Sequence, residues 1–92
     1  MKYLVKVYSN TCGPCKVLEK NIQTLGMDYL NSVGVKYKGV DILGPQGEEI
    51  ISDFNIRTVP TLLLIDNEGN EIKRHTGLLN VEQLKEFINE AS

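Results

Sequence analysis

The two cysteines of this 92-residue chain, Cys12 and Cys15, are separated only by Gly13 and Pro14 and directly follow an apolar, strand-like run. A thiol between a strand and a helix faces the free N–H groups of the first helical turn, which stabilise a thiolate. Because proline is tolerated in a first turn, Pro14 marks a helix start. Cys12 is therefore the candidate nucleophile.

The predicted helix places Cys15 on its apolar face. Apolar residues follow Cys15 at spacings of three or four, the pattern of a buried helical stripe: Leu18, Ile22, Leu25, Tyr29 and Val33. We therefore expect Cys15 to be the more buried thiol. One exposed, acidified thiol beside a sheltered one suits thiol-disulfide exchange, in which Cys12 attacks a substrate disulfide and Cys15 resolves the mixed disulfide, leaving a Cys12–Cys15 disulfide.

Three other roles for the cysteine pair compete with redox chemistry. A structural disulfide closing so short a loop would remove little entropy from the unfolded chain. A structural zinc site needs four ligands, and the chain offers no further cysteine and only one histidine, His75, far away in sequence. Inert buried thiols fit poorly with the polar run Ser9 to Thr11. Redox chemistry is favoured, and no metal is expected.

Three stretches of the chain together resemble a known family. They are the run Cys12-Gly13-Pro14-Cys15-Lys16 after residues 3–8, the run from Asn55 to Leu64, and Gly77 ahead of a final helix. The resemblance is to thioredoxins. It is specific over residues 3–16 and 54–91, whereas residues 34–53 match the family only in their general sequence pattern. It implies a disulfide reductase that binds no cofactor itself, acts on disulfide-containing client proteins and takes electrons from a thioredoxin reductase that uses NADPH and FAD.

The same resemblance assigns roles to residues outside the cysteine pair. Pro60 matches a family cis-proline that lies against the dithiol. Gly13 and Pro14, between the two cysteines, would also support the active site. Val59 would offer its backbone to an extended substrate chain, and Gly77 would lie at the docking surface.

Thr11 stands where thioredoxins usually carry a tryptophan. A large aromatic ring adds apolar contact area at a docking site, so its absence predicts a smaller, more polar docking surface beside the nucleophile. Thr11 is therefore a candidate substrate-contacting residue.

Lys6 is a second departure from the family, since thioredoxins usually carry a buried acid here that resembles a general base for the resolving cysteine. If Lys6 points toward the dithiol, its charge would favour both thiolates. The favoured alternative is that Lys6 lies along the sheet surface with its ammonium in water.

Composition limits the possible partners. A net charge of -2, from 10 basic and 12 acidic residues, gives no electrostatic argument for nucleic acid or an anionic membrane. The longest uncharged apolar run, Val59 to Ile65, is too short to span a bilayer, and Met1 to Tyr3 lead into a strand without a signal-peptide pattern. We expect a monomeric, cytoplasmic protein with protein partners.

The pattern of the whole chain predicts one α/β domain over residues 1–92. The first half is expected to hold a strand at 3–9, a helix at about 13–32 weakened at Gly26, and a strand at 35–42. A plain turn at 44–47, a helix at 48–54 and a hairpin of strands 62–66 and 71–76 are expected next. The final helix is expected to be capped by Asn80, with an apolar stripe ending at Ala91. This βαβαββα order predicts a mixed four-stranded sheet with helices on both faces, a thioredoxin-like fold without its usual N-terminal strand and helix. Side chains expected in solvent are Lys16, Glu19, Lys20, Gln23, Asp28 and His75.

Two other functions stay open. The short form and Thr58-Val59-Pro60 also resemble glutaredoxin, a glutathione-linked reductase. Gly13-Pro14 replaces the usual Pro-Tyr of that family, however, and residues 77–80 lack the Gly-Gly and acidic pair expected to grip glutathione. A third possibility is a redox-sensitive binding subunit without enzymatic activity, because fold alone does not fix function.

Overall fold

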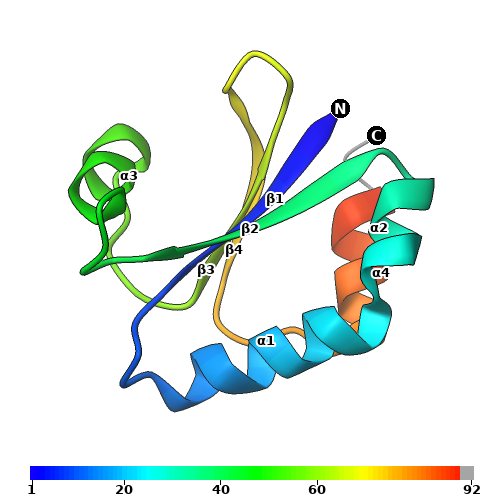
Figure 1. The fold of residues 1–92 in the computed structure, drawn as a ribbon, viewed down its shortest axis with the longest axis horizontal. Helices are drawn as coiled ribbons and strands as arrows, with labels where there is room; N and C mark the ends of the chain where they lie inside the picture. Colours follow the sequence, from blue (N-terminus) through cyan, green and yellow to red (C-terminus); the bar gives the residue numbers. More distant parts are fainter. Residues whose placement is uncertain (90–92) are drawn as a thin grey trace.

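A mixed four-stranded sheet forms the centre of the computed structural model, which describes residues 1–89 (Figure 1). β1 (Lys2–Tyr8) pairs in parallel with β2 (Val35–Asp41) and antiparallel with β3 (Thr61–Ile65), and β3 pairs antiparallel with β4 (Glu71–Thr76). The strand order β2-β1-β3-β4 makes β1 an interior strand. The strand that leads to Cys12 is therefore held on both edges.

Helices cover both faces of this sheet, as the sequence predicts (Figure 1). α1 (Gly13–Leu25), α2 (Met27–Ser32) and α4 (Val81–Asn89) lie on one face, and α3 (Gly47–Phe54) lies on the other. Each face has its own apolar cluster, with Leu4, Leu18 and Leu64 in the first and Val7 and Leu63 in the second. Burial on both faces explains the nearly continuous apolar runs of β1 and β3.

The first helical region differs from the prediction of one helix over about 13–32. Gly26 adopts a φ of +95°, which glycine tolerates because it has no Cβ, and this residue separates α1 from α2. Val33 was expected on the buried stripe but is 38% exposed. The change of direction at Gly26 takes Val33 off the face that carries Cys15.

The turn before α3 is tighter than the plain turn predicted for residues 44–47. Gly47 is buried, and a Cβ built on it would lie 2.0 Å from the carbonyl oxygen of Ile42. Only a residue without a side chain fits there, so the entry of α3 is fixed by contact between two stretches of backbone.

α4 begins with the cap predicted at Asn80. The Asn80 side-chain oxygen accepts the Gln83 backbone N–H at 2.8 Å, and the Gln83 side-chain oxygen accepts the Asn80 backbone N–H at 2.9 Å. This reciprocal pair satisfies two donors at the helix start. Leu84, Phe87 and Ile88 are buried, whereas Ala91 lies outside the described residues.

Replacing Asn80 with alanine should lower the free energy of unfolding by about 1 kcal/mol, because one first-turn donor loses its acceptor. Urea denaturation followed by circular dichroism measures this. Asn67→Ala, in the exposed tip of the hairpin, is the matched control and should change stability by less than about 0.5 kcal/mol. Equal effects of the two substitutions would contradict the capping role.

Candidate active site

Cys12 caps the N-terminus of α1. Its backbone is extended, with φ -92° and ψ 110°, and its Sγ accepts the backbone N–H of Cys15 at 3.1 Å. Pro14 lies within the first helical turn, as predicted. The Cys12 sulfur is therefore placed where helical N–H groups and the positive end of the helix dipole stabilise negative charge.

The two cysteines form a disulfide with a Cα–Cα distance of 5.2 Å. Cys15 is only 1% exposed, whereas Cys12 is half-buried. The difference follows from the helix, because Cys15 lies on the same face as the buried Leu18 and Ile22. Cys12 is therefore the more accessible residue, and Cys15 is sheltered one turn inside.

Pro60 and Gly77 lie together at the end of the sheet that leads to the cysteines. Thr61, the residue after Pro60, pairs with Val7 near the end of β1. The Gly77 backbone N–H donates to the Pro60 carbonyl at 3.0 Å. Pro60 is buried and Val59 is half-buried. The peptide bond between these two residues is cis.

The loop before Cys12 is polar and exposed, in line with the absence of a tryptophan. The Thr11 backbone N–H donates to the Ser9 hydroxyl oxygen at 3.2 Å, and the two hydroxyl oxygens lie 3.0 Å apart. The Asn10 side-chain amide donates to Asp41 at 3.0 Å, which ties this loop to the end of β2. The surface beside Cys12 therefore offers hydrogen-bonding groups.

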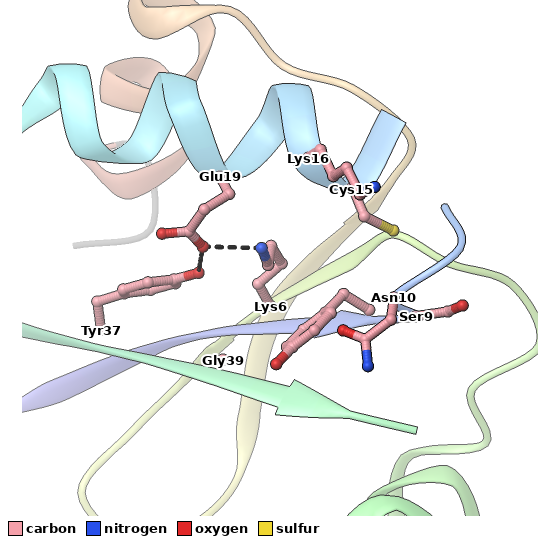
Figure 2. A pocket seen from close by; sticks show the side chains of 9 residues that line it. Lys6, Ser9, Asn10, Cys15, Lys16, Glu19, Tyr37 and Gly39 are labelled. Atoms are coloured by element: carbon pink, nitrogen blue, oxygen red, sulfur yellow. Dashed lines mark hydrogen bonds and ion pairs between the residues drawn. The ribbon is translucent and has the colours of Figure 1, made fainter. Parts of the chain in front are cut away.

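Lys6 does not extend into solvent, so the favoured prediction for its ammonium is wrong. The residue is 4% exposed, and its Nζ lies 2.7 Å from Glu19 Oε1 (Figure 2). Glu19 also accepts a hydrogen bond from the Tyr37 hydroxyl and one from the Gln23 amide at 2.7 Å. A charged lysine that is buried on an interior strand beneath α1 is stabilised by pairing with an acid.

Glu19 was expected on the solvated face, and neither it nor Tyr37 was predicted as part of the site. Burial raises the pKa of Glu19, but the hydrogen bonds from Lys6, Tyr37 and Gln23 and the charge of Lys6 outweigh it, so the pKa is lowered. Burial and the neighbouring carboxylate raise the pKa of Tyr37. Its hydroxyl therefore keeps its proton and remains a donor. The sequence feature that could have indicated an acidic partner was the lysine within an apolar strand, because a buried lysine requires such a partner.

Protonation of Glu19 should cost stability in acid. The pKa of Glu19 is lower in the folded state than its usual 4.5. The contribution of the ionised carboxylate to stability is therefore fully present above pH 4.5 and is lost as the pH falls through the pKa of the folded state. Glu19→Gln should therefore be less stable than the original chain at pH 7, and this difference should shrink progressively below about pH 4.5. Urea unfolding between pH 7 and pH 3 tests this; a difference constant over that range would contradict it.

An open pocket of about 500 Å³ lies between α1, β1 and β2 beside the buried cysteine. Its lining residues are Lys6, Tyr8, Ser9, Asn10, Cys15, Lys16, Glu19, Tyr37 and Gly39. Figure 2 shows the Cys15 sulfur and the Lys6–Glu19–Tyr37 group around this one space. Cys15 is 1% exposed, so it borders this space over only a small part of its surface.

Within residues 1–89 no cluster of three or more His, Cys, Asp or Glu residues could hold a metal ion. No helix there is both long enough and apolar enough to cross a membrane.

His75, which pairs with Leu62 across the hairpin, is half-buried on β4.

A cysteine pair at the start of a helix that follows an interior strand defines a thiol-disulfide oxidoreductase site. Comparison with known proteins agrees with this class. The Thioredoxin family model matches residues 1–90. Thioredoxin of Mycoplasmoides gallisepticum is 32% identical over 87 residues, covering 95% of this chain and 81% of its own length.

Other relatives and a solved structure support the same assignment. A prophage-derived thioredoxin-like protein of Bacillus subtilis is 28% identical, and the alignment covers 95% of both chains. The X-ray structure of Fasciola hepatica thioredoxin superimposes with a TM-score of 0.79 at 25% identity, covering 99% of this chain and 81% of that one. The chain belongs to the thioredoxin family, and it is a thiol-disulfide oxidoreductase of thioredoxin type with the predicted thioredoxin-like fold.

Proposed function

We propose that the chain reduces protein disulfides in two steps, with Cys12 attacking and Cys15 resolving. The Cys12 thiolate bonds to one sulfur of the client disulfide and expels the other as a thiolate. The Cys15 thiolate then bonds to Cys12 and releases the second client thiol. Two electrons pass to the client, and Cys12 and Cys15 end as a disulfide. The observation that carries this order is the half-buried Cys12 at the α1 N-terminus beside Cys15, which is 1% exposed.

The neighbouring residues have supporting roles in this proposal. Gly13 and Pro14 set the first turn of α1 that holds the Cys12 sulfur. Val59 presents its backbone to an extended client segment, Pro60 shapes the site beneath it, and Gly77 extends that surface through its bond to Pro60. The hydroxyl of Thr11 and its polar neighbours favour client segments with hydrogen-bonding groups beside the disulfide.

The electron donor in this proposal is an NADPH-dependent thioredoxin reductase, because the chain itself supplies only a dithiol. Thioredoxins bind no cofactor of their own, and the clients are disulfide-containing proteins. Residues 1–92 would act as one monomeric domain in the cytoplasm, where transient catalytic disulfides are typical and thiols are kept reduced. A net charge of -2 supports protein partners over nucleic acid.

The test is reduction of insulin disulfides with three electron sources. The chain is supplied with dithiothreitol, then with NADPH and thioredoxin reductase, and then with glutathione, glutathione reductase and NADPH. We expect turnover with the first two sources. Turnover only with the third would instead assign a glutathione-linked reductase. Failure with all three, with both thiols shown to be free, would assign a redox-sensitive binding subunit.

A further inference from the structure

Two opposite charges share the pocket that Cys15 lines. Glu19 follows Cys15 by four residues on α1, so the two side chains lie on neighbouring turns of one helix face. Lys6 approaches the same space from β1 and is 4% exposed. Its Nζ lies 2.7 Å from Glu19 Oε1 (Figure 2). The pair therefore shares its pocket with the resolving cysteine, whereas Cys12 is not among the residues that line it.

The two charges have opposite effects on a thiol that must ionise. A nearby cation favours the thiolate, and a nearby carboxylate disfavours it. Because the ammonium is buried, water and salt screen its charge less than they would an exposed one. As a pair the two charges partly cancel. Removing only one of them leaves the other uncompensated beside Cys15.

Tyr37 and Gln23 fix the negative member of the pair. Both donate hydrogen bonds to the Glu19 carboxylate, Tyr37 from β2 and Gln23 from the next turn of α1. Lys6 also lies 4.6 Å from the centre of the Tyr8 ring, which restricts its position on the other side. Residues of α1, β1 and β2 therefore hold the pair in position.

We propose that the Lys6–Glu19 pair sets the ionisation of Cys15, and through it the reduction potential of the Cys12–Cys15 disulfide, with each charge acting in the opposite direction. In the resolving step Cys15 gives its proton to water in the pocket, and its thiolate bonds to Cys12 while the client thiolate leaves. Lys6 and Glu19 are positioning residues that act through the charge on Cys15. This proposal rests on the proposed function and specifies how the same site is tuned.

Other ionisable groups face the same pocket. They are Tyr8 on β1, Lys16 on α1 and Tyr37 on β2. Lys16 is exposed to solvent, so its charge is screened more strongly than that of Lys6. Tyr37 keeps its proton beside Glu19, because the carboxylate and burial both raise its pKa. Lys6 is therefore the charged group in this pocket that solvent screens least.

The test compares four proteins: the original chain, Lys6→Met, Glu19→Gln and the double variant. The thiol-disulfide equilibrium constant is measured against glutathione at pH 7. Glu19→Gln leaves the cation and should stabilise the reduced form by about threefold to tenfold, and Lys6→Met should shift the constant in the opposite direction by a similar factor. A tenfold change corresponds to about 30 mV for this two-electron couple. The double variant should return to within about twofold of the original.

A kinetic readout separates tuning from structural damage. The rate at which a preformed mixed disulfide on Cys12 is resolved is measured from pH 5 to pH 10. Its midpoint should move to lower pH in Glu19→Gln and to higher pH in Lys6→Met. Lys20→Met removes an exposed α1 lysine outside the pocket and should leave both readouts unchanged. If Lys6→Met fails to fold, Lys6→Gln replaces it.

Two outcomes would overturn the proposal. Both single variants could shift the equilibrium constant in the same direction, which is expected from general loosening of the site. Alternatively, neither single variant could change the equilibrium constant by more than the Lys20→Met control does. These results are distinguishable from failure of the proposed function, because in that case the original chain itself would not reduce insulin.

Discussion

Replacing Cys12 with serine should abolish disulfide reduction. The N–H groups at the α1 N-terminus stabilise a thiolate at this position, but a serine hydroxyl is scarcely ionised near neutral pH and cannot form a disulfide with the client. Cys15 cannot substitute, because it is 1% exposed and cannot reach a client sulfur. The rate of insulin reduction with dithiothreitol, corrected for the uncatalysed reaction, should fall by at least about a thousandfold.

The control for this loss is Ser52→Ala. Ser52 lies exposed on α3, which packs against the face of the sheet opposite α1 (Figure 1). The substitution should leave the rate unchanged. Thermal unfolding of the Cys12→Ser protein should show an intact fold when compared with the reduced original chain. Retention of a tenth or more of the rate by a folded Cys12→Ser protein would contradict the role of Cys12 as nucleophile.

Replacing Gly47 with alanine should cause a large loss of stability, although it adds only one methyl group. The new Cβ would lie 2.0 Å from the Ile42 carbonyl oxygen and 2.9 Å from its Cα, so backbone must move against backbone. No side-chain rotation relieves such a contact. We expect a loss of at least about 3 kcal/mol in the free energy of unfolding, which for a chain of this size lowers Tm by about 12 °C or more.

Gly13→Ala is the matched control for Gly47→Ala. A Cβ at Gly13 meets no atom within 4 Å, and the residue begins a helix, where alanine is favourable. Its Tm should be equal to or slightly above that of the original chain. Calorimetry of both variants in the oxidised state measures the difference. Equal Tm values for the two would show that the turn before α3 adjusts freely, contrary to the structure.

Local sequence patterns predicted most of the fold. The spacing of Cys15, Leu18 and Ile22 predicted a buried helix face, and the polar loop at 67–70 predicted the hairpin of β3 and β4. These features depend on residues close together in sequence, where periodicity and turn chemistry act directly. The prediction of one helix over about 13–32 was wrong, because a glycine within an apolar pattern does not reveal whether its φ will be positive.

The charged part of the site could not be predicted in the same way. Lys6 pairs with a residue 13 positions away, and that residue binds Tyr37 a further 18 positions along the chain. Which acid lies over a given lysine depends on how α1 packs across the sheet. The contact between Gly47 and Ile42 likewise depends on the path of the turn. The sequence pattern favoured an ammonium in water and named no partner for Lys6, whereas the fold brings Glu19 to it.

The most direct test of the central claim is a trapping experiment that distinguishes the two sulfurs. Cys15→Ser and Cys12→Ser are each reduced and incubated with oxidised insulin, and covalent adducts are separated on a non-reducing gel and mapped by mass spectrometry. The half-buried Cys12, the more accessible of the two cysteines, should form a stable mixed disulfide in Cys15→Ser, and dithiothreitol should release it. Cys12→Ser should form at most a few per cent as much adduct, because Cys15 is buried. Adduct formation through Cys15 at an equal or greater level would contradict the assigned order of attack and resolution.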